Sequence, residues 1–273
     1  MKSAIMVLKE QINNFYLIRR LSLYEMKSHN RNNYLGMAWE VLNPAIQILI
    51  YWFVFGTLRS REPIEVGGVE IPFFSWLLAG FFLWIFFYQA TIQGSKSIYT
   101  RLRMLSKMNF PMSVIPNIAI FSKFYIHVVM VVISIVIFQL TGFYANIYYV
   151  QLIYFMFATF CLIYSISLIT STLSTIIRDV HMFLNSTLRM LLYLSGVLWP
   201  ITVLEDHQVI MKLLKLNPVY YLIEGYRASF FGVEWYLIEH WEYTMYFWIL
   251  VIVLFTFGSM LHVKFRRHFI DYL

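Results

Sequence analysis

The chain has 273 residues, of which 60% are hydrophobic, 19% are aromatic and only 13% are charged, and its formal net charge is +7. A soluble domain has about a quarter of its residues charged, so this composition excludes an ordinary soluble protein. Nearly uncharged runs of about 20 residues, the length of a helix that crosses a bilayer, predict an integral membrane protein. The basic residues gather at the ends of these runs, which indicates lipid headgroups and argues against nucleic acid as a partner.

Residues 1–36 precede the first apolar run and predict a helix that lies on the membrane surface. Apolar side chains occupy one helical face and basic or polar side chains the others: Ile5, Leu8, Ile12 and Phe15 against Lys2, Lys9, Asn13 and Arg20. A basic amphipathic helix of this kind lies in the interface plane with its apolar face in lipid. A merely solvated helix is the alternative.

Six apolar runs follow, over about 41–58, 73–92, 117–140, 147–170, 183–202 and 243–262. Each is expected to be helical, because an open strand in lipid leaves its backbone polar groups unpaired. The period-2 alternation of a transmembrane barrel is absent. The predicted fold is therefore an all-α membrane domain with six transmembrane helices, forming one domain over residues 1–273.

The basic residues also predict the orientation of these helices. With the N-terminus in the cytoplasm, both termini and the connections after the second and fourth spans face inward. This arrangement places most of the 21 basic residues inside and most of the 14 acidic residues outside, as the positive-inside rule requires. We expect a multi-pass protein of the plasma membrane with cytoplasmic N- and C-termini.

The connection over residues 93–116 is basic and contains two prolines. Pro111 fits the end of a short cytoplasmic helix, because the residue before a proline avoids helical geometry. Pro116 fits the first turn of the third span, where a missing N–H costs nothing. A basic loop that only signals topology is the simpler alternative. Arg178 and Asp179 form a second inward turn, between the fourth and fifth spans, to which the same alternative applies.

Residues 203–242 are too many for a simple turn and too aromatic for a solvated loop. Two short helices that dip into the outer leaflet, broken at Asn217–Pro218 and at Gly232, explain this composition. Irregular backbone at membrane depth is tolerated only where protein or water satisfies it. An aromatic belt at the membrane surface is a compatible alternative.

Few ionisable residues lie in or beside the spans: Glu40, Lys123, His127 and Arg189. Such residues are functional candidates, since charges inside a membrane are costly. Their side chains either snorkel to the cytoplasmic surface or line a polar cavity open to it. In the second case Lys123 and Arg189 are placed to meet an anionic headgroup such as a diphosphate.

Tyr and Trp offer flat faces that stack on sugar rings, together with a polar group. Most of the aromatic residues are expected to pack or to face lipid, but a minority could line a route for a carbohydrate chain. The candidates for this substrate path, with the two cations above, are Trp39, Tyr51, Trp84, Tyr88, Tyr193 and Trp199.

Motifs of enzyme chemistry are missing from the sequence. No G-x-x-x-x-G-K-[ST] loop occurs, and the nearest fragment, QGSKSIYT, lacks its glycine spacing. The seven histidines show no metal-binding spacing such as H-E-x-x-H, and no G-x-S-x-G elbow is present. We therefore expect neither an ATPase site nor a metal site nor a catalytic residue in this chain.

Four stretches together resemble a known family: NYLGMAWEVLNPAIQILIYWFVFG (33–56), QGSKSIYTRLRMLSKMNFPMSVIPN (93–117), IIRDVH (176–181) and LKLNPVYYLIEGYR (214–227). They are similar to the polysaccharide-export branch of the ABC-2 transporter permeases, and within it to the teichoic acid translocation type of Gram-positive bacteria. The resemblance extends in order over essentially the whole chain. The N-Y-L-G-x-x-W…N-P and S-K-M-N-F-P segments carry most of its specificity.

The resemblance implies a homodimer of this chain docked to two copies of a separate ABC ATPase subunit, which would bind the ATP and Mg²⁺. The implied substrate is a wall teichoic acid polymer, or its precursor, on an undecaprenyl diphosphate carrier, moved to the outer face of the plasma membrane. No cofactor is implied for this chain itself.

The same resemblance assigns roles along the chain. An interface helix falls on about residues 5–30, a coupling helix on 95–111 and short gate helices on 205–232. The residues implied in coupling to the ATPase are Arg101, Arg103, Lys107, Asn109, Phe110, Pro111, Arg178 and Asp179. Those implied at the extracellular gate are Asn217, Pro218, Tyr220, Glu224 and Arg227.

Other functions stay open at this stage. Another lipid-linked polysaccharide, such as an O-antigen or a capsule, could be the substrate, and so could a hydrophobic drug. A membrane-embedded glycosyl- or acyltransferase would need an acidic or histidine site near a membrane face, which the sequence does not show. A purely structural anchor is disfavoured by the Asn, Gln, Arg and His residues inside the spans.

Overall fold

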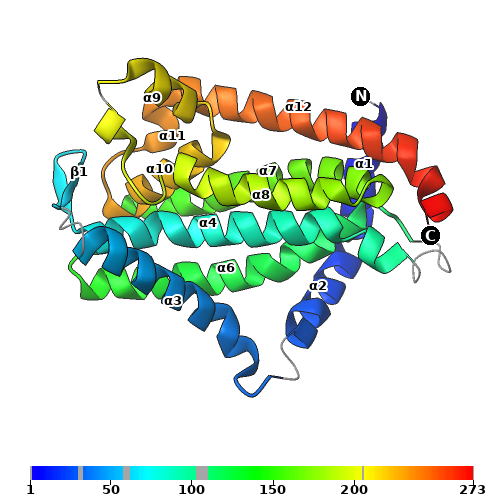
Figure 1. Ribbon diagram of the computed structural model, residues 1–273, viewed down its shortest axis with the longest axis horizontal. Coiled ribbons are helices and arrows are strands. Elements are labelled where there is room, and N and C mark those ends of the chain that lie inside the picture. The colour runs from blue at the N-terminus through cyan, green and yellow to red at the C-terminus, as the bar shows by residue number, and fades with distance from the viewer. Residues whose placement is uncertain (1, 30–32, 58–61, 103–109, 205, 273) are drawn as a thin grey trace.

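The computed structural model is an elongated bundle of long helices (Figure 1) and describes residues 2–29, 33–57, 62–102, 110–204 and 206–272. Its centre is α4 (Phe73–Lys96), which packs against α6 (Val114–Leu140) and α7 (Val150–Ile176). On the other side of α7 lies α12 (Trp241–Phe265). Two further helices, α3 (Trp39–Trp52) and α8 (Asp179–Leu194), pack along α4.

Among the described residues, five helical segments are long and apolar enough to cross a membrane: Gly36–Thr57, Phe73–Lys96, Val114–Leu140, Ile147–Ile176 and Trp241–Phe269. They coincide with the first, second, third, fourth and sixth predicted spans, whose helical structure is thereby confirmed. The most apolar window of α4 is 78% buried, whereas that of the segment containing α3 is only 11% buried. The second span is therefore the core of the bundle, and the first lies at its edge.

The fifth predicted span, 183–202, differs from the structure. The helix begins at Asp179 and ends at Leu194, and its 16 residues extend about 24 Å, less than the ~30 Å of a hydrocarbon core. Gly196 then adopts a left-handed conformation (φ +65°), which turns the chain. A helix through residue 202 was therefore a wrong prediction, and the presence of six spanning helices stays a prediction.

The N-terminal region forms two helices, α1 (Lys2–Asn13) and α2 (Phe15–His29). The first lies across the end of the bundle and packs on α12, and the second packs on α6 (Figure 1). Polar contacts fix α1: Gln11 Nε2 donates to Ser113 O (3.1 Å), and Arg266 Nη1 donates to Glu10 Oε1 (2.7 Å). All four predicted apolar positions are exposed, as an interface helix requires of the face that meets lipid: Ile5, Leu8, Ile12 and Phe15.

Both chain termini, the C-terminal end of α4, the start of α6 and the α7–α8 turn lie at one end of the bundle, here called the terminal end (Figure 1). The opposite end, here called the hairpin end, has β1 (Ile64–Val66) paired antiparallel with β2 (Val69–Ile71). Gly67 and Gly68 form its two-residue turn, with φ of +57° and +80°.

Three short helices lie at the hairpin end between α8 and α12: α9 (Gln208–Lys215), α10 (Pro218–Phe231) and α11 (Tyr236–Glu239). The predicted breaks are confirmed. Asn217 caps α10 by accepting a hydrogen bond from Val219 N (3.0 Å), Pro218 is in its first turn, and Gly232 ends it in the left-handed conformation (φ +68°). Most of α10 is buried against α4 and α7.

Short irregular helices complete the described structure. Five are 3-10 turns and one, η2, is a π-helical turn that extends α3: η1 (Gly36–Ala38), η2 (Phe53–Thr57), η3 (Tyr99–Arg101), η4 (Ile147–Tyr149), η5 (Ile201–Leu204) and η6 (Arg266–Tyr272).

Candidate functional site

Two neighbouring hollows open along α4 on the side of α3. The first, the α8 cavity, has a volume of about 370 Å³ and is lined from α3, α4 and α8 by Gln47, Tyr51, Phe81, Trp84, Ile85, Tyr88, Gln89, Arg189, Leu192 and Tyr193. The second, the α6 cavity, has a volume of about 270 Å³ and is lined from α3, α4 and α6 by Trp39, Glu40, Asn43, Tyr88, Gln89, Ile92, Gln93 and Lys123. Tyr88 and Gln89 belong to both, so the cavities adjoin.

Helical periodicity explains how the sequence builds these walls. On α3 the lining side chains recur every three or four residues, at positions 40, 43, 47 and 51. On α4 they recur in the same way at 81, 85, 88–89 and 92–93. Residues at this spacing share one face of a helix, so each helix presents a continuous strip to the cavities.

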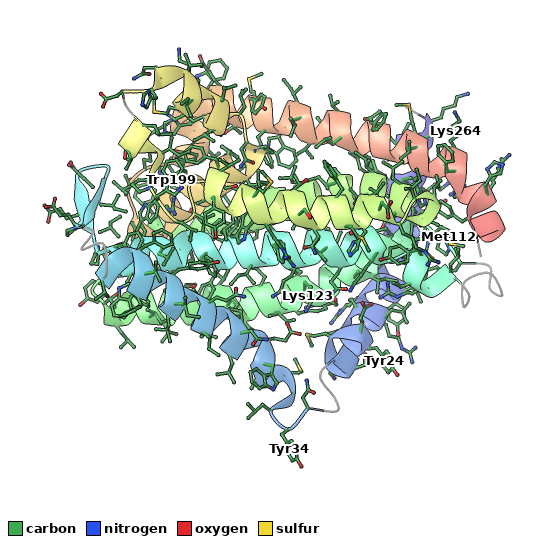
Figure 2. The ribbon with its side chains drawn as sticks, viewed as in Figure 1. Tyr24, Tyr34, Met112, Lys123, Trp199 and Lys264 are labelled. Atoms are coloured by element: carbon green, nitrogen blue, oxygen red, sulfur yellow. The ribbon has the colours of Figure 1, made fainter. Side chains whose placement is uncertain are left out.

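The structure brings together seven of the eight residues predicted for the substrate path: Trp39, Tyr51, Trp84, Tyr88, Lys123, Arg189 and Tyr193. The eighth, Trp199, lines neither cavity and donates its indole N–H to Tyr193 O (2.8 Å). Figure 2 shows Trp199 near the hairpin end and Lys123 near the middle of the bundle. Contact of these residues with a substrate stays a prediction.

The two predicted cations of the path differ in their partners. Lys123 Nζ lies 3.0 Å from Glu40 Oε2 and 3.1 Å from Oε1, and only about a tenth of either side chain is exposed. Arg189 is exposed, and within the described ranges no carboxylate pairs with it. Lys123 is therefore neutralised in place, whereas Arg189 is available to an anion. His127 is a packing residue, hydrogen-bonded to Tyr226 Oη (2.8 Å) and stacked on Phe86.

Sequence reasoning missed four amide side chains of the cavities: Asn43, Gln47, Gln89 and Gln93. None of them hydrogen-bonds to another residue that the structure describes. The signal was present as two amide pairs at i, i+4 spacing in apolar spans, which places each pair on one helix face. Tyr88, which lines both cavities, is fixed in position because its hydroxyl donates a hydrogen bond to Asn185 Oδ1 on α8 (2.7 Å).

At the terminal end, Arg101 pairs with Glu25 of α2 (Nη2 to Oε1, 2.5 Å) and donates to Ser97 O (3.0 Å). Phe110 packs between two small apolar clusters at this end, and Pro111 O accepts a hydrogen bond from Val114 N in the turn that begins α6. The other coupling candidates, Arg103, Lys107 and Asn109, lie outside the described residues.

Arg178 and Asp179 are exposed in the turn between α7 and α8, which adjoins the end of α4. There, His181 Nδ1 is 2.7 Å from Ser95 Oγ, and its ring contacts Tyr99 edge-on. Burial raises the pKa of Tyr99, while Arg178 lowers it. Burial and then Lys96 lower the pKa of His181. The described coupling candidates thus lie at one end of the bundle.

Among the predicted gate residues, Arg227 is completely buried, and its side chain is inaccessible to solvent. Its guanidinium lies over the Trp76 ring, 3.4 Å from the centroid, and pairs with Glu224 Oε1 at 2.6 Å. It also donates to the carbonyls of Gly196 (2.9 Å), Val197 (3.2 Å) and Trp76 (3.3 Å). Arg227 therefore joins α10 to α4 and to the turn that ends α8.

Two more gate candidates contact that same turn. Asn217 Nδ2 donates to Ser195 Oγ (2.8 Å), and a Cβ added at Gly196 would lie 3.0 Å from the Tyr220 ring. Movement of these residues in a gate stays a prediction. Within the part of the chain that the structure describes, no group of three or more His, Cys, Asp or Glu side chains could hold a metal ion.

Comparison with known proteins gave a family match and several relatives. The model of the ABC-2 type transporter family matches residues 16–231. An O-antigen export system permease protein of Myxococcus xanthus is 26% identical over 209 residues, which cover 76% of this chain and 77% of the relative. Two proteins of the same name from Klebsiella pneumoniae are each 22% identical; the alignments cover 95% of both chains in one case, and 98% of this chain and all of the relative in the other.

Proposed function

This chain belongs to the ABC-2 type transporter family, and we propose that it is the transmembrane permease of an ATP-driven exporter of a lipid-linked polysaccharide. Membership of this family implies a multi-pass membrane protein that works with a separate ATPase subunit. The observation that carries the proposal is the pair of adjoining cavities, walled by aromatic rings and amides from three helices of the bundle. Aromatic faces and amides are the groups that recognise sugar rings and their hydroxyls.

A polar polymer needs such a path, because burying its hydroxyls or phosphates in hydrocarbon without partners would cost several kcal/mol for each group. The cavities replace lost water with side-chain donors and acceptors. Arg189, exposed in the α8 cavity, suits the diphosphate of an undecaprenyl carrier. On this view the headgroup meets Arg189 and the sugar chain follows along the amides and aromatic rings.

The polymer that we propose first is an O-antigen-like polysaccharide, since the relatives from Myxococcus xanthus and Klebsiella pneumoniae carry the name of O-antigen export permeases. A wall teichoic acid polymer, implied by the resemblance of the four sequence stretches, is the second candidate. Both would share the lipid diphosphate carrier and differ in the chemistry of the repeating unit.

We also propose that two copies of the chain form the permease. The segment containing α3 is only 11% buried in its most apolar window, and α3 walls both cavities. A second copy that covers this face would close the cavities into a path between protomers. The closed point-group symmetry of most oligomers favours a two-fold pair.

In this proposal the chain is not itself an enzyme. The partner ATPase, also in two copies, binds ATP and Mg²⁺ and docks at the terminal end, where Arg101 and the Arg178–Asp179 turn lie beside the α4–α6 connection. The basic residues of the connections support a cytoplasmic position for that end and for both termini. The hairpin end, with α9, α10 and α11, then faces outward as the gate.

The test is reconstitution of the purified permease with its ATPase in proteoliposomes. We expect co-purification, ATP hydrolysis stimulated by an undecaprenyl diphosphate-linked O-antigen chain, and movement of that chain across the vesicle membrane. Stronger stimulation by lipid-linked wall teichoic acid would instead favour the second candidate. Failure to bind any ATPase, or formation of a new glycosidic bond by the permease alone, would contradict the proposal.

A further inference from the structure

The four cavity amides are polar groups without a structural task. Asn43 and Gln47 stand on α3, and Gln89 and Gln93 stand on α4, each pair one helical turn apart. Gln89 and Gln93 are half-buried, whereas Asn43 and Gln47 are exposed where they line the cavities. Buried or half-buried amides that stabilise a fold are normally hydrogen-bonded within it, as Gln11 and Gln151 are elsewhere in this chain. These four make no hydrogen bond to any residue in the described ranges. Their donors and acceptors are therefore open to a ligand.

Each cavity receives amides from both helices. The α8 cavity holds Gln47 from α3 and Gln89 from α4, and the α6 cavity holds Asn43 and Gln93 with the shared Gln89. Residues at i, i+4 are about 6 Å apart along a helix, a spacing comparable with the length of a sugar ring. An amide offers two N–H donors and a carbonyl acceptor side by side, which matches the alternating donors and acceptors of neighbouring sugar hydroxyls.

Few charged side chains line the two cavities. Of the residues that the structure describes, three charged ones line the two cavities, and two of them, Lys123 and Glu40, neutralise each other. Arg189 is left as a single cation in the α8 cavity. A polymer with one phosphate in every repeat would find one unpaired cation for many charges, and it would also pass the Glu40 carboxylate. Sites that bind polyanions instead repeat Lys and Arg along their length.

We propose that the four amides form a binding track for uncharged sugar rings, so that this permease selects a neutral glycan over a polymer with a phosphate in each repeat. This inference rests on the proposed export function and adds the class of substrate. Arg189 serves the single diphosphate at the carrier end, and the amides serve the repeating units.

Uncharged amides also suit a chain that has to move. Conduction through a path requires sites that bind well enough to admit a ligand and weakly enough to release it to the next site. A neutral hydrogen bond contributes about half as much as a charge-assisted one. A series of amides at regular spacing therefore lets a sugar chain advance from one set of hydrogen bonds to the next, along a wall that also contains Trp84 and Tyr88.

The experiment compares two probes on the reconstituted permease–ATPase complex. Both carry undecaprenyl diphosphate, one with a chain of neutral hexoses and the other with a poly(glycerol phosphate) chain of matched length. For the wild type we expect the KM of stimulated ATP hydrolysis to be at least about tenfold lower with the neutral chain, the factor that corresponds to about one hydrogen bond. Vesicle transport of each probe is measured in parallel.

Substitutions of the amides test whether these side chains determine the selectivity. Gln47→Leu and Gln89→Leu are expected to raise the KM for the neutral chain about tenfold each and to leave kcat within about twofold. Gln139→Leu is the matched control, since Gln139 is a half-buried amide in α6 that lines neither cavity. Gln89→Lys adds a cation and should lower the KM for poly(glycerol phosphate) while raising that for the neutral chain, an exchange that misfolding cannot imitate.

Equal KM values for the two probes, or Leu variants with an unchanged KM for the neutral chain, would overturn the amide track but leave polysaccharide export standing. If the complex assembles and hydrolyses ATP but transports neither probe, the proposed function itself is wrong and the amide track falls with it.

Discussion

Arg189 and Arg227 have the same side chain and opposite surroundings. Arg227 is completely buried, pairs with Glu224, covers the Trp76 ring and donates to three backbone carbonyls. Arg189 is exposed in the α8 cavity, and nothing in the described chain forms an ion pair with it. The Arg227 guanidinium donates four hydrogen bonds inside the protein, whereas the Arg189 guanidinium has its donors open to a ligand.

This difference indicates that Arg227 stabilises the fold, whereas Arg189 is available for function. A buried charge must be paired and hydrogen-bonded, because its desolvation otherwise costs several kcal/mol. Arg227 therefore shows where the fold is fixed, at the junction of α10, α4 and the end of α8. Arg189 costs the fold little, since water reaches it, and it is free to bind an anion. The same distinction applies to amides, with Gln151 bonded to Glu234 O and Gln89 unbonded within the described residues.

The largest expected effect comes from the same substitution at both arginines. Arg227→Met leaves Glu224 and the carbonyls of the α8 turn without their donor, and we expect it to lower the free energy of unfolding by about 3–5 kcal/mol. Arg189→Met should change it by less than about 0.5 kcal/mol. Thermal and denaturant unfolding of the purified proteins in detergent measure both. Similar losses for the two variants would remove the distinction between them.

The Glu40–Lys123 pair is an intermediate case, in which a cavity cation is already neutralised. Only about a tenth of either side chain is exposed, so Glu40→Gln strands Lys123 in a poorly solvated place, and we expect a loss of about 1–3 kcal/mol. The double variant Glu40→Gln with Lys123→Met should recover most of that loss, which a double-mutant cycle measures. Additive losses would show that the two side chains do not interact.

The sequence predicted the parts of this molecule that depend on local patterns. Long apolar runs located five helices of sufficient length, and Asn217, Pro218 and Gly232 located the ends of α10, because caps and left-handed glycines act within one turn. The prediction of a helix through residue 202 was wrong, and the cause is again local. Gly196 turns the chain, and an apolar run alone does not reveal a positive φ. The β1–β2 hairpin was also missed, although its V-G-G-V stretch has a hairpin signature.

The site was predicted in part. Aromatic and charged residues attract attention by type, and seven of those chosen line the cavities. The amides were missed because Asn and Gln residues do not stand out by type. Their importance depends on the absence of a hydrogen-bond partner, which only the folded structure reveals. The Lys123–Glu40 contact joins residues 83 positions apart, so only the packing of α3 against α6 could reveal it.

A smaller effect is expected from Arg189 in binding. Arg189→Gln keeps a polar side chain but removes the charge, and we expect about a tenfold rise in the concentration of lipid-linked substrate that half-stimulates ATP hydrolysis. The basal ATPase rate and co-purification with the ATPase should not change. Lys264→Gln, which removes an exposed charge from α12 outside both cavities, is the control. An equal effect of Lys264→Gln would indicate general electrostatic attraction.

The smallest effect on stability is expected at Arg101, whose pair with Glu25 is about a quarter exposed at each side chain. Such a partly exposed pair contributes about 0.5–1 kcal/mol, so Arg101→Glu should scarcely lower the unfolding temperature of the complex. Its effect on coupling is expected to be larger, because the pair fixes α2 to the segment that leads into the α4–α6 connection.

The exchange variant, Arg101→Glu with Glu25→Arg, distinguishes the two ways in which Arg101 could act. If Arg101 positions α2, restoring the pair with reversed charges restores co-purification with the ATPase and substrate-stimulated hydrolysis, and this is the result we expect. If Arg101 instead contacts the ATPase directly, the exchanged pair stays uncoupled although the helices are held as before. Because Arg101 already pairs with Glu25 and donates to Ser97 O, it resembles Arg227 more than Arg189, and this likeness favours a positioning role.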